Sequence, residues 1–207
     1  RADSCELARL GTFDHGPGPW SPSDTLRIVS CSHIVPIKRV TLLAEALRHV
    51  RRPVRWTHFG EGPERPALER AVRALPSHVS VSLPGNVANQ QLLSWYRTEP
   101  VHLFVHLSST EGGVPVSMQE ATSFGIPLLA ADAGGVREIV GPATGTLLPH
   151  DPEPRAIAAL LDSFQEGPQH TADFRAGVRA AWSVGFKAEV NFGHFCDRLL
   201  HAAEGRA

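Results

Sequence analysis

The residues most able to do chemistry lie in the run EGGVPVSMQEA, which begins at Glu111 and includes Glu120. Two consecutive glycines, Gly112 and Gly113, expose backbone N–H groups with no side chain in the way, and such groups suit phosphate or sugar oxygens. Pro115 favours a helix start just afterwards, whose dipole would add positive potential at the same place. Inside that helix, Glu120 could accept hydrogen bonds from a vicinal diol. The run therefore predicts a site for a phosphate- or sugar-containing ligand.

A cluster of cations follows the first apolar run of the chain. His33, Lys38 and Arg39 lie just before a predicted helix, whose N-terminal amides favour anions. They outline a diphosphate site, although taken alone they fit a solvated Lys-Arg pair at the start of a surface helix better. No GxGxxG pattern occurs in this loop, which argues against a dinucleotide fold of the dehydrogenase kind. The carboxylates Glu111 and Glu120 could also indicate glycoside hydrolysis, but a hydrolase of that kind needs no cations aimed at a diphosphate.

Two further turns carry paired glycines. Gly60 and Gly62 follow the second apolar run, where they would let the backbone turn tightly beside a flat ligand such as a base. Another double glycine, at 134–135, precedes a further predicted helix, as Gly112 and Gly113 do. Arg137 and Glu138 are expected to pair with each other or with that helix start.

Six short apolar runs alternate with segments of helical period, which is typical of a parallel sheet with helices on both faces. The runs are 26–30, 54–59, 79–83, 101–105, 126–130 and 145–148. We therefore expect an α/β fold with a Rossmann-like open parallel sheet of about six strands. Ligands of such sheets lie outside the carboxyl ends of the strands, where the loops described above begin.

Apolar residues at helical spacing predict three core-facing helices, over 40–47, 68–75 and 157–164. A further helix is expected between Pro115 and Gly125, which suit its first position and the residue past its end. The polar stretch 166–185 predicts an exposed helix with loose ends. A C-terminal helix with apolar residues between Phe192 and Leu200 could pack across the sheet or onto a neighbouring domain.

The composition predicts one ligand-binding domain. A chain of 207 residues with 42% hydrophobic content can bury one good-sized core. Residues 1–24, which include a Pro- and Gly-rich stretch, are expected to be a linker or the remnant of a missing N-terminal domain. Residues 25–165 would form the binding domain, and residues 166–207 would form helices that pack on it or cross to the missing domain.

Charge and cysteine content indicate the compartment and exclude some partners. The formal net charge of -1 provides no basic field for a nucleic acid, and no apolar run approaches the roughly twenty residues of a membrane span. The three cysteines Cys5, Cys31 and Cys196 are far apart, and two lie in apolar segments, which suits buried thiols in a reducing compartment. We expect a cytoplasmic protein.

The loop segments together resemble the retaining group 1 glycosyltransferases, also called family-four glycosyltransferases, of the GT-B fold. The run SCSHIVPIKRVTLLAEAL is similar to that family's first strand and phosphate loop, and HFGEGP is similar to its second-strand turn. The highly specific signature block is matched by EGGVPVSMQEATSFGIPLLAADAGGVREIV. The resemblance covers nearly all of residues 25–150. It implies the C-terminal, nucleotide-sugar-binding half of such an enzyme, with an N-terminal acceptor-binding domain as its partner.

The resemblance also implies roles for particular residues. Lys38 would contact the diphosphate of a UDP-, GDP- or ADP-linked sugar, Glu111 would lie beside the donor sugar, and Glu120 would hold the ribose hydroxyls. Glu111 and Lys38 would carry the catalysis, with no metal and no cofactor. The donor site would be completed by His33, Arg39, Gly60, Gly62, Gly112, Gly113 and Val114. Without its N-terminal domain the chain is expected to be inactive, and any association with the inner membrane would come through that domain.

The sequence departs from the family pattern at two places in the site. The family commonly has an arginine where this chain has His33. Glu111 and Glu120 are separated by eight residues where the family has seven, so Gly112 stands where the first glutamate belongs. These departures leave open a second hypothesis, a non-catalytic module that binds a nucleotide sugar or docks to a partner enzyme. A third is a sugar-nucleotide epimerase, which can share the GT-B architecture.

Overall fold

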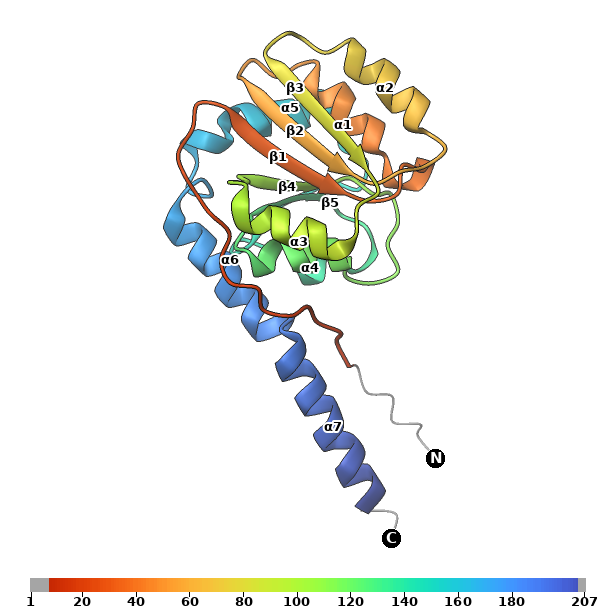
Figure 1. Ribbon diagram of the computed structural model, residues 1–207, viewed down its shortest axis with the longest axis vertical. Helices are drawn as coiled ribbons and strands as arrows, with labels where there is room; N and C mark the ends of the chain where they lie inside the picture. The colour runs from red at the N-terminus through yellow and green to blue at the C-terminus, as the bar shows by residue number, and fades with distance from the viewer. Residues whose placement is uncertain (1–7, 205–207) are drawn as a thin grey trace.

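The computed structural model describes residues 8–204 and contains a six-stranded, fully parallel sheet in the order β3-β2-β1-β4-β5-β6 (Figure 1). The strands are β1 (Leu26–Cys31), β2 (Val54–Phe59), β3 (Val79–Gly85), β4 (Leu103–His106), β5 (Leu128–Ala131) and β6 (Gly145–Leu148). All six predicted apolar runs therefore form strands, and the expected α/β fold is confirmed.

The strand order reverses direction at the pair β1 and β4, where Ile28 lies beside Leu103 and Val29 beside Phe104. The chain moves outward from β1 through β2 to β3, then returns to β4 on the other side of β1. Connections that leave neighbouring strands in opposite directions open a crevice at their carboxyl ends. The loops after β1 and β4, 73 residues apart at Lys38 and Glu111, meet there.

Helices cover both faces of the sheet because each carries one apolar stripe. Packed in one core layer are α1 (Val40–Leu47), α2 (Arg65–Arg73) and α5 (Pro154–Ser163). On the other face lie α3 (Asn89–Thr98), α4 (Val116–Ser123) and α6 (Ala172–Gly185). The three short 3-10 helices are η1 (Pro36–Lys38), η2 (Gly134–Glu138) and η3 (Phe164–Glu166). The helices predicted around 40–47, 68–75 and 157–164 are confirmed as α1, α2 and α5.

The helix predicted between Pro115 and Gly125 is α4, but Pro115 takes the N-cap position, with ψ at 130°, instead of the first helical position. An N-cap residue has extended backbone angles, which proline tolerates. Gly125 lies past the helix end with φ at +76°, a left-handed conformation in which glycine is favoured.

The stretch 166–185 contains α6, and the prediction of an exposed helix is wrong on one side. Val178 is fully buried, Trp182 is buried in the second core layer, and Arg175 is only 6% exposed. The Arg175 guanidinium donates to the carbonyl oxygens of Val101 and Phe124, at 2.7 Å and 3.3 Å. Burial lowers the pKa of this arginine to about 10. A residue type that usually indicates a surface is here a buried link between α6 and the sheet.

The last helix, α7 (Ala188–Glu204), extends away from the sheet (Figure 1). Phe192 is 42% exposed and Leu200 62% exposed, so its apolar residues are not covered by the described part of the chain. Cys196 is also exposed and Cys31 is half-buried, which makes the prediction of buried thiols wrong for Cys196. Cys5 lies outside the described residues. No helix between residues 8 and 204 is long and apolar enough to cross a membrane.

Candidate functional site

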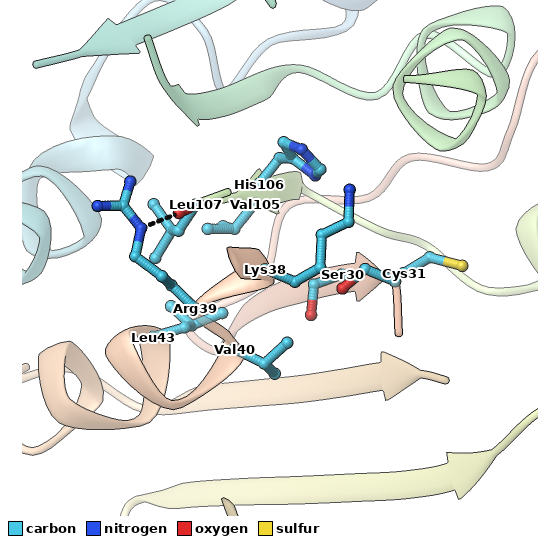
Figure 2. Close-up of a pocket in the computed structure, with 10 residues that line it drawn as sticks. Ser30, Cys31, Lys38, Arg39, Val40, Leu43, Val105, His106 and Leu107 are labelled. Atoms are coloured by element: carbon cyan, nitrogen blue, oxygen red, sulfur yellow. Dashed lines mark hydrogen bonds between the residues drawn. The ribbon is translucent and has the colours of Figure 1, made fainter. Parts of the chain in front are cut away.

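The loop after β1 brings Lys38 to the crevice beside β4. This loop forms η1, and Arg39 then adopts a left-handed conformation, with φ at 47° and ψ at 40°, before α1 begins at Val40. That conformation is uncommon for a residue with a side chain. The side chains of Lys38 and Arg39 therefore point in different directions. Figure 2 shows Lys38 pointing toward His106 while Arg39 points away from it.

The centre of the site is the carboxylate of Glu111. Its Oε1 atom lies 2.5 Å from Nζ of Lys38 and 2.8 Å from Nε2 of His106. Burial alone would raise the pKa of Glu111, but hydrogen bonds from His106, Lys38 and Ser108 outweigh it and lower the pKa to about 2. The carboxylate is therefore ionised at neutral pH.

The negative charge of Glu111 determines which nitrogen of His106 faces it with a hydrogen. An ionised carboxylate can only accept hydrogen bonds, so Nε2 of His106 must carry the hydrogen that it shares with Oε1. His106 is the last residue of β4 and its side chain is only 5% exposed. The predicted apolar run ended one residue earlier, at Val105, so the sequence analysis missed His106. A polar residue closing a buried parallel strand was the available signal.

Arg39 lines the same small pocket as Lys38 and His106, but its guanidinium is held by protein groups. Its guanidinium donates to the backbone oxygens of Leu107, Ser108 and His150, and forms an ion pair with Asp151 at 2.7 Å. These contacts tie α1 to the loops after β4 and β6. In this arrangement Arg39 is a positioning residue, and its direct contact with a diphosphate stays a prediction that the geometry does not favour.

A pocket of about 250 Å³ lies on the β2 side of the crevice. Glu120 lies in it, 9% exposed, and its Oε1 accepts a hydrogen bond from Nδ2 of Asn89 at 2.7 Å. Burial raises the pKa of Glu120. The exposed His33 and the turn at Gly60 line the same pocket. Asn89 was not anticipated because α3, with few regularly spaced apolar residues, was not predicted.

The glycines after β2 serve the backbone of the β1 loop. A Cβ atom on Gly60 would lie 1.9 Å from the carbonyl oxygen of Ser32, and one on Gly62 would lie 2.3 Å from that of Ile34. Gly60 also has φ at +142°. The two loops approach so closely that only glycine fits. Gly60 lines the Glu120 pocket as well, but Gly62 is not among the residues that line it. Its contact with a base stays a prediction.

The double glycine at 112–113 faces open space. A Cβ atom at either position would meet nothing within 4 Å, and both residues are exposed. The second double glycine packs directly behind this loop, because a Cβ on Gly134 would lie 1.7 Å from the carbonyl oxygen of Glu111. Val114 follows, half-buried, and accepts a hydrogen bond at its carbonyl from Gln119. Between residues 8 and 204 no acceptor bonds the amides of Gly112 and Gly113, so the loop carries open amides on one side and a close backbone support on the other.

Arg137 and Glu138, just beyond that support, do not pair with each other. Arg137 forms an ion pair with Asp132, and Glu138 forms one with Arg9 at 3.3 Å. Of the two expected pairings, the one with each other is wrong, because successive residues of a helical turn point to different sides, and Arg137 instead pairs with Asp132 just before the start of η2.

A buried hydrogen-bonded row lies under the first two loops. Nε1 of Trp56 donates to Oγ of Ser30 at 2.8 Å, and the same oxygen lies 2.8 Å from Nδ1 of His58. An indole N–H can only donate, so the Ser30 hydroxyl hydrogen is free to reach Nδ1 of His58. Burial lowers the pKa of His58 to about 4, which keeps it neutral. The row braces the strands that present the Lys38 and Gly60 loops.

Comparison with known proteins identifies relatives of the chain. Residues 19–180 match the family described as glycosyl transferases group 1. Over 164 residues the chain is 28% identical to D-inositol 3-phosphate glycosyltransferase of Xylanimonas cellulosilytica, which covers 77% of this chain and 39% of that protein. Over 195 residues it is 32% identical to GDP-mannose-dependent alpha-mannosyltransferase of Mycobacterium tuberculosis, covering 90% and 46%.

A solved structure shows the same fold. The crystal structure of Anabaena HepE in complex with UDP superposes with a TM-score of 0.72 at 23% identity, covering 86% of this chain and 49% of that one. The chain thus spans less than half the length of these three proteins. Because the family match extends over most of the sequence, the protein belongs to the glycosyl transferases group 1 family.

Proposed function

We propose that this chain is the donor-binding part of a retaining glycosyltransferase, which transfers a sugar from a nucleotide diphosphate sugar to an acceptor. The observation that carries the proposal is the meeting of Lys38, Glu111 and the open Gly112-Gly113 amides at the β1 and β4 crevice. A fixed cation and oriented amides suit the charge that develops on a departing nucleoside diphosphate. These residues supply that stabilisation from the protein itself.

The donor would extend from the pocket around Glu120 to the crevice beside Lys38 and Glu111. The pocket of about 250 Å³ around Glu120 has room for a nucleoside, with the carboxylate accepting from the ribose hydroxyls. From there the diphosphate would reach Lys38 and the amides that precede α4, whose dipole favours an anion. Glu111 would then lie beside the sugar. The one-residue shift in spacing is compatible with this, because Glu111 itself meets Lys38.

The names of the relatives support a nucleotide sugar as the donor. One is a GDP-mannose-dependent mannosyltransferase, and the solved Anabaena protein holds UDP. The choice between UDP, GDP and ADP sugars is left to experiment. Because the relatives are more than twice as long, the acceptor site is proposed to belong to an N-terminal domain of the complete enzyme. That domain would also carry any peripheral contact with the inner membrane, and the enzyme would act in the cytoplasm.

The proposal is tested by calorimetric titration of the chain with UDP, GDP and ADP. We expect saturable binding of one nucleotide, which Lys38→Ala and Glu120→Ala each weaken by tenfold or more, since hydrogen bonds to charged groups contribute about 1.5–3 kcal/mol. Glu45→Ala removes an exposed carboxylate on α1 and is the matched control. No binding of any of the three, or binding that neither substitution weakens, would contradict the proposal. Binding without transfer by the complete enzyme would favour a non-catalytic module.

A further inference from the structure

Oε1 of Glu111 accepts hydrogen bonds from two side chains that differ in exposure. Lys38 and His106 both contact Oε1 at hydrogen-bond distance, and the nearby Ser108 hydroxyl also lowers the pKa of the carboxylate. The Lys38 side chain is 21% exposed and flexible, whereas that of His106 is 5% exposed. His106 also lies in the sheet, where its backbone pairs with Ala130 of β5. One donor can leave the carboxylate, and the other is held beside it.

The proposed function requires the Lys38 side chain to move. If its ammonium group contacts the donor diphosphate, it gives up at least part of its contact with Glu111. The Glu111 side chain is only 12% exposed, so it could not replace the lost donor fully with water. A carboxylate left without a donor in such a place is costly. The N–H of His106, which already points at Oε1, is the group that stays.

We propose that His106 is a positioning residue, which holds the Glu111 carboxylate in place when the donor diphosphate draws Lys38 away. The inference rests on the proposed function. Contact at Oε1 leaves Oε2 as the acceptor for a hydroxyl of the donor sugar. His106 touches neither donor nor acceptor in this arrangement and acts through Glu111 alone.

The inference is tested with His106→Leu, His106→Gln and the Glu111→Gln background. UDP, GDP and ADP are each titrated into the wild-type chain, and the one that binds most tightly is used for all variants. In His106→Leu, nucleotide binding draws Lys38 from a carboxylate that has already lost its histidine donor, so we expect affinity to fall about tenfold, which corresponds to about 1.4 kcal/mol. His106→Gln places an amide N–H where the imidazole N–H was and should recover most of the loss.

The Glu111→Gln background separates positioning from folding. A neutral amide at 111 has no charge to compensate, so His106→Leu should change affinity less than twofold there, whereas a general loss of structure would persist. His49→Leu, at an exposed histidine at the end of α1, is the matched control and should bind like wild type. Unchanged affinity in His106→Leu, no recovery in His106→Gln, or an undiminished loss in the Glu111→Gln background would overturn the inference. A wild-type chain that binds none of the nucleotides would instead overturn the proposed function, and the inference with it.

Discussion

Replacement of Gly134 by alanine should displace the backbone at Glu111, against which Gly134 packs. Gly134 has φ at +51°, and a Cβ there would lie 1.7 Å from the carbonyl oxygen of Glu111. The left-handed conformation alone costs an alanine about 1–2 kcal/mol. Non-bonded carbon contacts settle near roughly 3.5 Å, so the backbone at Glu111 must move by more than about 1.5 Å. The obstructing atom belongs to the backbone, which cannot swing aside as a side chain would.

A movement of that size separates Glu111 from both of its donors, which now lie 2.5 Å and 2.8 Å away. Two partly buried, charge-assisted hydrogen bonds would be weakened in addition to the backbone strain, so we expect a loss of about 2–4 kcal/mol in the free energy of unfolding. Urea unfolding measures this loss, and calorimetric titration of the folded variant should show nucleotide affinity reduced tenfold or more.

Gly141→Ala provides the matched control, because a Cβ at Gly141 would meet nothing within 4 Å. Its stability should change by less than about 0.5 kcal/mol. If Gly134→Ala unfolds at the same urea concentration as wild type and binds the same nucleotide equally well, then the support assigned to the second double glycine is wrong.

Three further outcomes follow from charges and burial. Folding lowers the pKa of Glu111 from 4.5 to about 2, so the ionised carboxylate stabilises the folded chain above about pH 4.5, and this stabilisation is lost as pH falls toward 2. Urea unfolding of the wild type should show a loss of about 2 kcal/mol over that range that Glu111→Gln does not show. Burial lowers the pKa of His102 from 6.5 to about 4, so the unfolded chain binds the proton first and this residue should contribute a fall in stability of about 2–3 kcal/mol between pH 7 and pH 4, beside the fall that His58 contributes. His102→Gln should remove its own share of the pH dependence, and an unaltered pH slope there would refute the assignment. Arg175→Leu leaves the carbonyl oxygen of Val101 without its guanidinium donor, whereas that of Phe124 keeps the N–H of Gly18, and thermal unfolding should report a loss of about 1–3 kcal/mol; a melting temperature within a degree of wild type would contradict this.

Several features were predictable because they depend on neighbours in sequence. The β-branched and leucine-rich runs gave all six strands, and the apolar stripes gave α1, α2 and α5. Helix α3 escaped prediction because its segment NQQLLSWYRT is mostly polar, and only Leu92 and Tyr96 are buried. The buried side of α6 escaped for a related reason, since an arginine fills a position where an apolar residue is the usual signal.

Some residues of the candidate site could be named from their loops, but their contacts could not. Lys38, Glu111 and Glu120 were identified from the loops that carry them, and the structure brings Lys38 and Glu111 together. The turn of Arg39 away from the crevice follows from one left-handed backbone position and from acceptors more than sixty residues away. No local pattern reports such acceptors.

The sequence by itself determined the strands, most of the helices and the identity of the chemically capable loops, because apolar periodicity, glycine and proline act over a few residues. Only the tertiary structure decided which of those loops share a crevice. That outcome depends on the strand order, which sets the carboxyl ends of β1 and β4 side by side. Through that adjacency Glu111 acquires both Lys38 and His106, and its carboxylate stays charged inside a partly buried site.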